Sequence, residues 1–132
     1  MNARKSPSKR ALPWKRPGAA ARRRALMLQT CPDCGYVQYP FQEICRRCLG
    51  GSPAPKEQPG GGILQAATEL HASIDEFLRG YLPLRIGSIK LDCGPVVIAY
   101  LEESCTARTR RVRVTAGVDR RGRPVLVASP EK

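Results

Sequence analysis

The chain has 132 residues, of which 42% are hydrophobic and 26% charged, and its formal net charge at pH 7 is +12. This length allows one ordinary domain or two very small ones, and no apolar run approaches the roughly 20 residues of a membrane span. Residues 1–30 contain nine Lys and Arg and no acidic residue, which leaves a net charge of only +3 for residues 31–132. The basicity therefore belongs to the N-terminal segment and does not indicate a nucleic-acid-binding body.

Residues 1–24 are predicted to be a disordered basic tail. They combine the Lys and Arg with Pro, Ala and a single aromatic, Trp14, and so few apolar groups cannot offset the entropy of ordering. Three functions fit such a tail: binding to RNA, DNA or an acidic partner surface; an Arg-rich, acid-free transit peptide; or a dispensable extension, with Met27 as an alternative start. We favour the dispensable extension.

The cysteines of residues 25–50 predict a zinc ribbon. They follow the pattern C-x2-C-x10-C-x2-C and are Cys31, Cys34, Cys45 and Cys48. Two intervening residues let one turn aim both sulfurs at a single point, and a hairpin brings back a second pair to complete a tetrahedron around Zn²⁺. Gly35 follows the first pair, where the backbone needs a conformation that glycine adopts at little cost. Short strands at residues 25–30 and 36–39 would form the hairpin.

Other chemistries for these cysteines fit the sequence less well. Disulfides would suit a secreted chain, but we find no secretory signal, and a redox motif uses one Cys-x-x-Cys pair in a βαβ context. Four thiolates leave no open position for water or substrate, so the zinc is expected to be structural. Arg46 and Arg47 either offset the negative charge of the thiolates or are solvated surface charges. Cys93 and Cys105 are expected to be small core residues, which is consistent with a reducing, cytoplasmic setting.

Residues 51–61 are rich in Pro and Gly and are predicted to be a linker without regular structure. The following region, residues 62–132, is predicted to be mainly β. Four segments have the composition or the alternation of strands, namely residues 84–91, 96–101, 111–115 and 124–128. Residues 63–71 fit either a strand or a helix, and Ser73 with Glu76 resembles a capping box for one short helix. Five short strands with one helix predict a small closed barrel such as the OB-fold.

The order of these parts resembles the zinc-ribbon/OB-fold family of acyl-CoA-associated proteins. In the ribbon the resemblance rests on Cys-Pro-Asp-Cys-Gly at 31–35, Tyr-Pro at 39–40, and the second cysteine pair. In the barrel it rests on residues 62–68 with His71, Leu-Asp-x-Gly at 91–94, and Asp-x-x-Gly-x-Pro-Val at 119–125. The match covers about residues 26–130. The chain departs from the family pattern in its long basic N-terminus and in lacking a glycine within residues 104–111.

This resemblance implies a rubredoxin-like ribbon and a non-catalytic accessory subunit of a thiolase or acyl-CoA hydratase complex. Coenzyme A would need arginines for its phosphates and an apolar slot for its pantetheine arm. Five barrel arginines are candidates for that rim, although outward arginines also keep a strand edge soluble; they are Arg85, Arg108, Arg110, Arg111 and Arg113.

Two other classes of function remain as alternatives. Nucleic-acid binding through the tail is the second hypothesis, because ribbons and OB-folds both serve it elsewhere, yet the barrel has few aromatic residues for base stacking. An independent enzyme is disfavoured, because His71 is the single histidine and no nucleophile has a visible activating partner.

Overall fold

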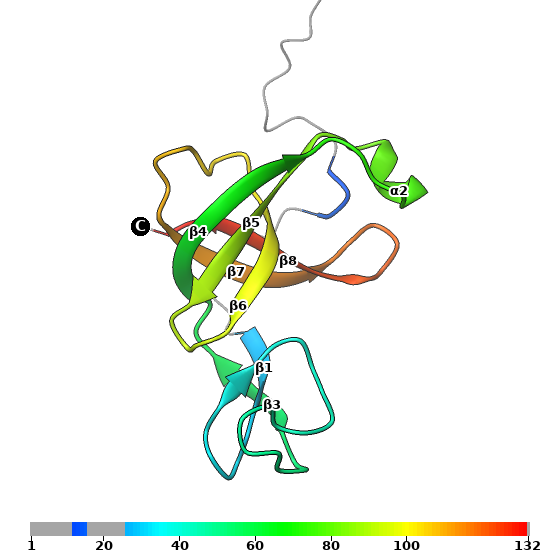
Figure 1. Cartoon of the computed structure of the whole chain (residues 1–132). Helices are drawn as coiled ribbons and strands as arrows, with labels where there is room; N and C mark the ends of the chain where they lie inside the picture. Colours follow the sequence, from blue (N-terminus) through cyan, green and yellow to red (C-terminus); the bar gives the residue numbers. More distant parts are fainter. Residues whose placement is uncertain (1–11, 16–25, 132) are drawn as a thin grey trace, which may run out of the picture.

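The computed structural model describes residues 12–15 and 26–131, and Figure 1 shows a small β unit below a larger barrel. The smaller unit contains β1 (Leu26–Thr30), β2 (Val37–Gln38) and β3 (Ala54–Gln58) in the order β2-β1-β3. The barrel contains β4 (Gly61–Leu70), α2 (Glu76–Arg79), β5 (Leu84–Leu91), β6 (Val96–Leu101), β7 (Arg111–Val118) and β8 (Pro124–Pro130). The prediction of a mainly β chain with an N-terminal ribbon and a five-stranded barrel is confirmed.

The barrel closes in the order β4-β5-β6-β8-β7, with β4 pairing to β7. All its strand pairs are antiparallel except β6 and β8, which run parallel through Tyr100↔Val127 and Leu101↔Ala128. Five strands closed in this order form an OB-fold. None of the helices in the described part of the chain is long and apolar enough to cross a membrane.

The ribbon and the barrel share one hydrophobic core. Leu26 and Leu28 of β1 are 2% exposed and pack in the same cluster as Ile89, Val112 and Val114 of the barrel. Side chains at alternate positions of β1 therefore fill the end of the barrel, since residues two apart on a strand lie on the same face. The predicted division into a ribbon and a barrel therefore separates two stretches of sequence, but side chains of both stretches pack together in one core.

The predicted linker is largely a strand. All five residues of β3 pair with β1, from Ala54↔Thr30 to Gln58↔Leu26, so the prediction of irregular structure for residues 51–61 is wrong there. The strand tolerates Pro55 because β3 is at the edge of its sheet, where a missing backbone N–H breaks no ladder.

Two further predictions need correction. Most of the predicted disordered tail, residues 1–11 and 16–24, lies outside the described residues, but Leu12 and Trp14 are buried against the barrel, so disorder is wrong for this short segment. The helix cap is Asp75 and not Ser73: the Asp75 carboxylate accepts a hydrogen bond from the backbone N–H of Phe77. The ambiguous region 63–71 is the strand β4, which its pairing with β5 stabilises.

Candidate metal centre and barrel groove

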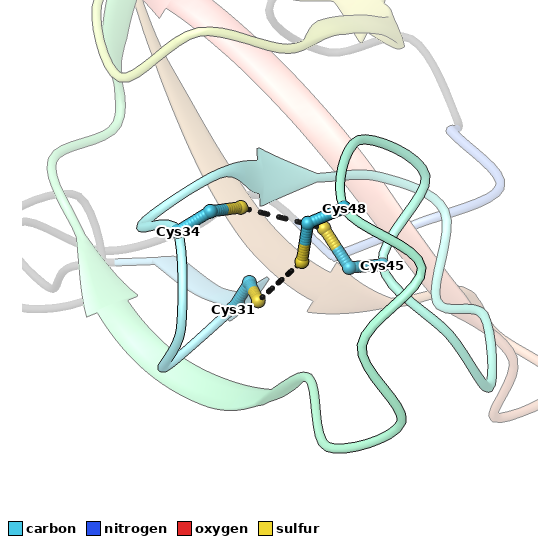
Figure 2. A group of neighbouring side chains, drawn as sticks. All are labelled: Cys31, Cys34, Cys45 and Cys48. Atoms are coloured by element: carbon cyan, nitrogen blue, oxygen red, sulfur yellow. Dashed lines mark hydrogen bonds between the residues drawn. The ribbon is translucent and has the colours of Figure 1, made fainter.

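The four ribbon cysteines converge on one point, as Figure 2 shows. Their ligand atoms all lie within 4.8 Å of one another, and the Sγ–Sγ distances are 3.5 Å for Cys31–Cys48 and 3.7 Å for Cys34–Cys45. A tetrahedral zinc with Zn–S bonds of about 2.3 Å places its sulfurs roughly 3.8 Å apart. The donor set and its spacing therefore fit a structural Zn²⁺ held by these cysteines.

The two cysteine turns have the same backbone geometry. The N–H of Gly35 donates to the carbonyl of Cys31, and the N–H of Leu49 donates to the carbonyl of Cys45, each at 2.9 Å. Both closing residues have positive φ, +77° for Gly35 and +64° for Leu49. The expected left-handed glycine is confirmed, and Leu49 adopts the same conformation without the freedom of glycine.

Backbone N–H groups of the ribbon donate to the cysteine sulfurs, and each such bond favours the ionised form of its thiol. The N–H of Cys48 lowers the pKa of the Cys45 thiol to about 7, and Arg47 donates its backbone N–H to the same sulfur. The pKa of Cys48 is raised to about 12 although the N–H of Gly50 lowers it, because its hydrogen bonds with neighbouring thiols favour the neutral form. A bound Zn²⁺ would favour the ionised form of every thiol in the group. The side chains of Arg46 and Arg47 are exposed, which leaves both predicted interpretations of them open.

A buried pair of glutamines, which no sequence motif predicts, positions the second cysteine turn. Gln38 is 1% exposed and donates to the Gln29 side chain and to the carbonyl of Ile44, while its Oε1 accepts from the N–H of Arg46. Gln29 in turn bonds both backbone groups of Gln42. The two side chains thus make the hydrogen bonds to the backbone of residues 42–46 that a neighbouring strand would otherwise make. Their only sequence signal is a glutamine on each strand of the hairpin.

Replacing Gln38 with leucine is expected to destabilise the ribbon by about 1–3 kcal/mol for each buried group left unpaired. The N–H of Arg46 and the carbonyl of Ile44 would lose their side-chain partner, and the Gln29 side chain would keep only its bonds to Gln42. Thermal unfolding and zinc affinity would both report the change. Gln42→Ala is the matched control, because Gln42 joins the network through its backbone. Equal stability of the two variants would contradict the role given to Gln38.

The five predicted ligand arginines do not gather at one rim. Arg85 donates to the carbonyl of Cys105 at 2.6 Å. Arg111 makes a bidentate ion pair with Asp92 at 2.8–2.9 Å and also contacts Glu131, which pairs with Arg113. Arg85 and Arg111 pair with β4 residues six positions apart, or about 20 Å along the strand.

Arg108 and Arg110 lie exposed on the loop between β6 and β7. Of the five predicted arginines, the pair on β7 is occupied by carboxylates and the pair on the loop is the more accessible to an anion.

Burial raises the pKa of Cys105, whose thiol donates to the carbonyl of Ala128. This agrees with the predicted core role of Cys105, whereas Cys93 is only half-buried.

A groove of about 450 Å³ lies on the outer face of the barrel. Its apolar floor comes from β5, β6 and β8, and Tyr39 of the ribbon and Tyr100 of β6 both line it; the aliphatic lining residues include Leu70, Leu78, Ile86, Ile98, Val125 and Leu126. Its rim comes from the connection that holds α2 and from the turn between β7 and β8. The face of the second and third strands, with these two loops, is where OB-folds bind ligands.

Arg121 joins the two loops of that rim. Its guanidinium contacts Asp75 at the start of α2 and Asp119 in the β7–β8 turn, each at 2.9 Å, and lies 4.2 Å from the ring centre of Phe77. The hydrogen bond from Arg121 holds the pKa of Asp75 below its usual value. Burial raises the pKa of Asp119, but hydrogen bonds from Arg121 and from the N–H of Arg123 outweigh it and lower that pKa.

These lowered pKa values predict a pH-dependent effect of Arg121→Gln. A carboxylate with a depressed folded-state pKa stabilises the fold above its unfolded pKa of about 3.9, and that stability is lost as the pH falls toward the folded value. The variant should therefore melt below the wild-type temperature at pH 7, with the difference shrinking below about pH 4. Arg46→Gln, on the exposed ribbon surface, is the control. A difference that is constant from pH 7 to pH 3 would exclude these ion pairs as its source.

A four-thiolate ribbon followed by a five-stranded barrel defines a zinc-ribbon/OB-fold protein. Residues 19–54 match the family of ChsH2 rubredoxin-like zinc ribbon domains, so the ribbon is of that type. The chain is also similar to a solved structure described as "Ltp2-ChsH2(DUF35) aldolase", with 18% identity, a TM-score of 0.65, and coverage of 84% of this chain and 88% of that chain. No curated protein matches the sequence. These findings confirm the predicted resemblance in the ribbon and in the overall fold.

Proposed function

We propose that the chain is a non-catalytic accessory subunit of an enzyme complex of the thiolase or acyl-CoA hydratase type, acting in cytoplasmic lipid metabolism. The observation that carries this proposal is the joint match of ribbon and barrel to a protein whose description names ChsH2 together with Ltp2. A fold that matches across most of both chains supports a shared role in binding a partner subunit.

The chemistry of the described residues supports an accessory role. Among them, the four ribbon cysteines are the group of metal-ligating side chains that converge, and a tetrathiolate site leaves zinc no open position. His71 is exposed and lies 3.1 Å from Glu69, which is also exposed. An imidazole in solvent is poorly placed to exchange protons with a bound substrate.

The groove supplies the slot that an acyl-CoA would need. Its aliphatic floor suits the pantetheine arm or the acyl chain, and Tyr39 and Tyr100 line it with two phenol groups. Arg123 lines the same groove, and an arginine there suits a phosphate. Arg108 and Arg110 stay in the proposal as further phosphate contacts, because both side chains are exposed.

Coenzyme A binding can be tested on the isolated protein by calorimetry. Arg123→Ala should weaken binding about tenfold, the usual value of a charge-assisted contact of about 1.4 kcal/mol, whereas Arg46→Ala, on the exposed surface of the ribbon, should not change it. No measurable binding by the wild-type protein would reject the groove as the site of coenzyme A. It would leave the bridging role to be tested separately.

The partner is tested by native co-purification with a C-terminal tag. Recovery of a thiolase or acyl-CoA hydratase in near-stoichiometric amount, resistant to nuclease, is the expected result. Recovery of nuclease-sensitive ribosomal or DNA-associated proteins would reject the accessory role and favour the nucleic-acid hypothesis, in which the basic N-terminal residues bind the polymer.

A further inference from the structure

A short N-terminal segment, residues 12–14, covers part of the outer face of the barrel. Trp14 is 2% exposed and stacks on Tyr100 with a ring-centre distance of 4.6 Å and an interplanar angle of 24°. Leu12 and Trp14 form a hydrophobic cluster with Leu84 and Val127, separate from the main core. In Figure 1 this segment is the short blue piece near α2 and the β7–β8 hairpin. Tyr100, which it covers, also lines the groove.

The barrel recognises the backbone of this segment as well as its side chains. The N–H of Arg120 donates to the carbonyl of Pro13 at 2.8 Å, and its Nε donates to the carbonyl of Leu12 at 2.6 Å. Trp14 forms an antiparallel β-bridge with Asp119. Contacts to successive carbonyls, with pockets for alternate side chains, are how a strand edge binds an extended peptide. The antiparallel bridge and the two carbonyl contacts together are the geometry of an added peptide strand.

The segment is anchored by a few contacts and one of them is incomplete. The indole Nε1 of Trp14 is buried and has no hydrogen-bond partner within the described residues, and an unpaired buried donor weakens binding. Residues 12–14 are buried, and Lys15 directly after them is exposed. A segment held by so few contacts can be displaced from the barrel.

We propose that this face is a docking site for an extended peptide containing an aliphatic residue, a proline and an aromatic residue in succession. Residues 12–14 fill it in cis. A partner protein that presents a segment of the same chemistry binds the barrel by displacing them, with its aromatic ring on Tyr100 and its carbonyls on Arg120. The inference does not depend on the proposed acyl-CoA function, because it concerns peptide binding alone.

The single tryptophan of the chain makes the cis contact measurable. Trp14 emission in the full protein should be blue-shifted as for a buried indole, and Tyr100→Ala should shift it toward the solvent value. Tyr36→Ala, in the ribbon, is the matched control and should leave the emission unchanged. A solvent-like emission in the wild-type protein would overturn the proposal.

Docking in trans is the stricter test. A variant lacking residues 1–15 contains no tryptophan, so all indole emission in a mixture with a peptide of residues 8–18 comes from the peptide. We expect a saturable blue shift with the wild-type peptide and none with the Leu12→Asp peptide. The full-length protein should bind the wild-type peptide at least tenfold more weakly in calorimetry, because a tethered segment has an effective concentration of about millimolar.

Two controls keep this test decisive. Zinc content and circular dichroism must show that the truncated variant is folded; if it is not, full-length Trp14→Ala, which also lacks tryptophan, takes its place. Absence of a blue shift with a folded acceptor would overturn the docking site. A full-length dimer that dissociates on Trp14→Ala would show that the segment docks on a second copy and would overturn the cis assignment.

Discussion

Replacing Cys31 with serine is expected to release zinc and to destabilise the barrel as well as the ribbon. Loss of one thiolate opens the tetrahedral site, and a ribbon of this size depends on its metal to fold. Leu26 and Leu28 would then leave the core that they share with the barrel. Removing such side chains from a core costs about 2–5 kcal/mol each. Metal analysis and thermal unfolding of the purified variant would measure both effects.

Cys93→Ser is the matched control for this experiment. Cys93 is half-buried in the barrel and outside the group of converging thiols, so the variant should retain its zinc and most of its stability. Full zinc occupancy in Cys31→Ser would refute the four-cysteine site. Zinc loss without any change in barrel unfolding would instead show that the shared cluster contributes little to the barrel.

Gly60→Ala is expected to cost about 1–3 kcal/mol or more, as overpacking of a close contact does. A Cβ at this position would lie 2.4 Å from the backbone carbonyl oxygen of Val114, and the carbonyl of Gly60 also accepts a hydrogen bond from the N–H of Val114. The clash would separate the start of the barrel from β7. Chemical denaturation with one fluorescence and one circular dichroism probe would measure the loss.

Gly51→Ala tests whether this effect is specific. Gly51 belongs to the same glycine-rich stretch of sequence, but a Cβ there meets no atom within 4 Å, so the variant should be as stable as the wild type. If both glycines tolerate alanine, the close approach of Gly60 to β7 is wrong. Comparison of the two variants distinguishes a glycine that close packing requires, Gly60, from one that only connects two strands, Gly51.

Sequence alone predicted the elements whose side chains alternate locally. In β5 and at the start of β7 apolar and polar residues alternate, whereas β6 and β8 are short, mainly apolar runs bounded by turns. The turns contain Gly94 and Gly122, which adopt φ of +131° and +88°. The metal site was predictable because two Cys-x-x-Cys turns fix their own geometry. In each case the information lies within a few residues along the chain.

What the sequence did not predict depends on contacts between distant residues. Pro55 suggested a linker, and only its place at a sheet edge makes it compatible with β3. Trp14 lies among basic residues that indicate disorder, and its partner Tyr100 is far along the chain. The groove likewise takes its lining from the ribbon, the α2 connection, the β7–β8 turn and the strands β4, β5, β6 and β8. No local pattern encodes such a surface.

β6 and β8 are joined by fewer residue pairs than any other neighbouring strands of the barrel, and residues 12–14 pack across this pairing. Only two residue pairs join these strands, whereas seven join β7 to β8. Tyr100 and Val127 form one of the two pairs and both pack with Trp14. Strands joined by few residue pairs are where a barrel opens first in local fluctuations. Detachment of residues 12–14 would therefore weaken the β6–β8 pairing. A peptide that binds at this face would then also affect how readily the barrel opens between these two strands.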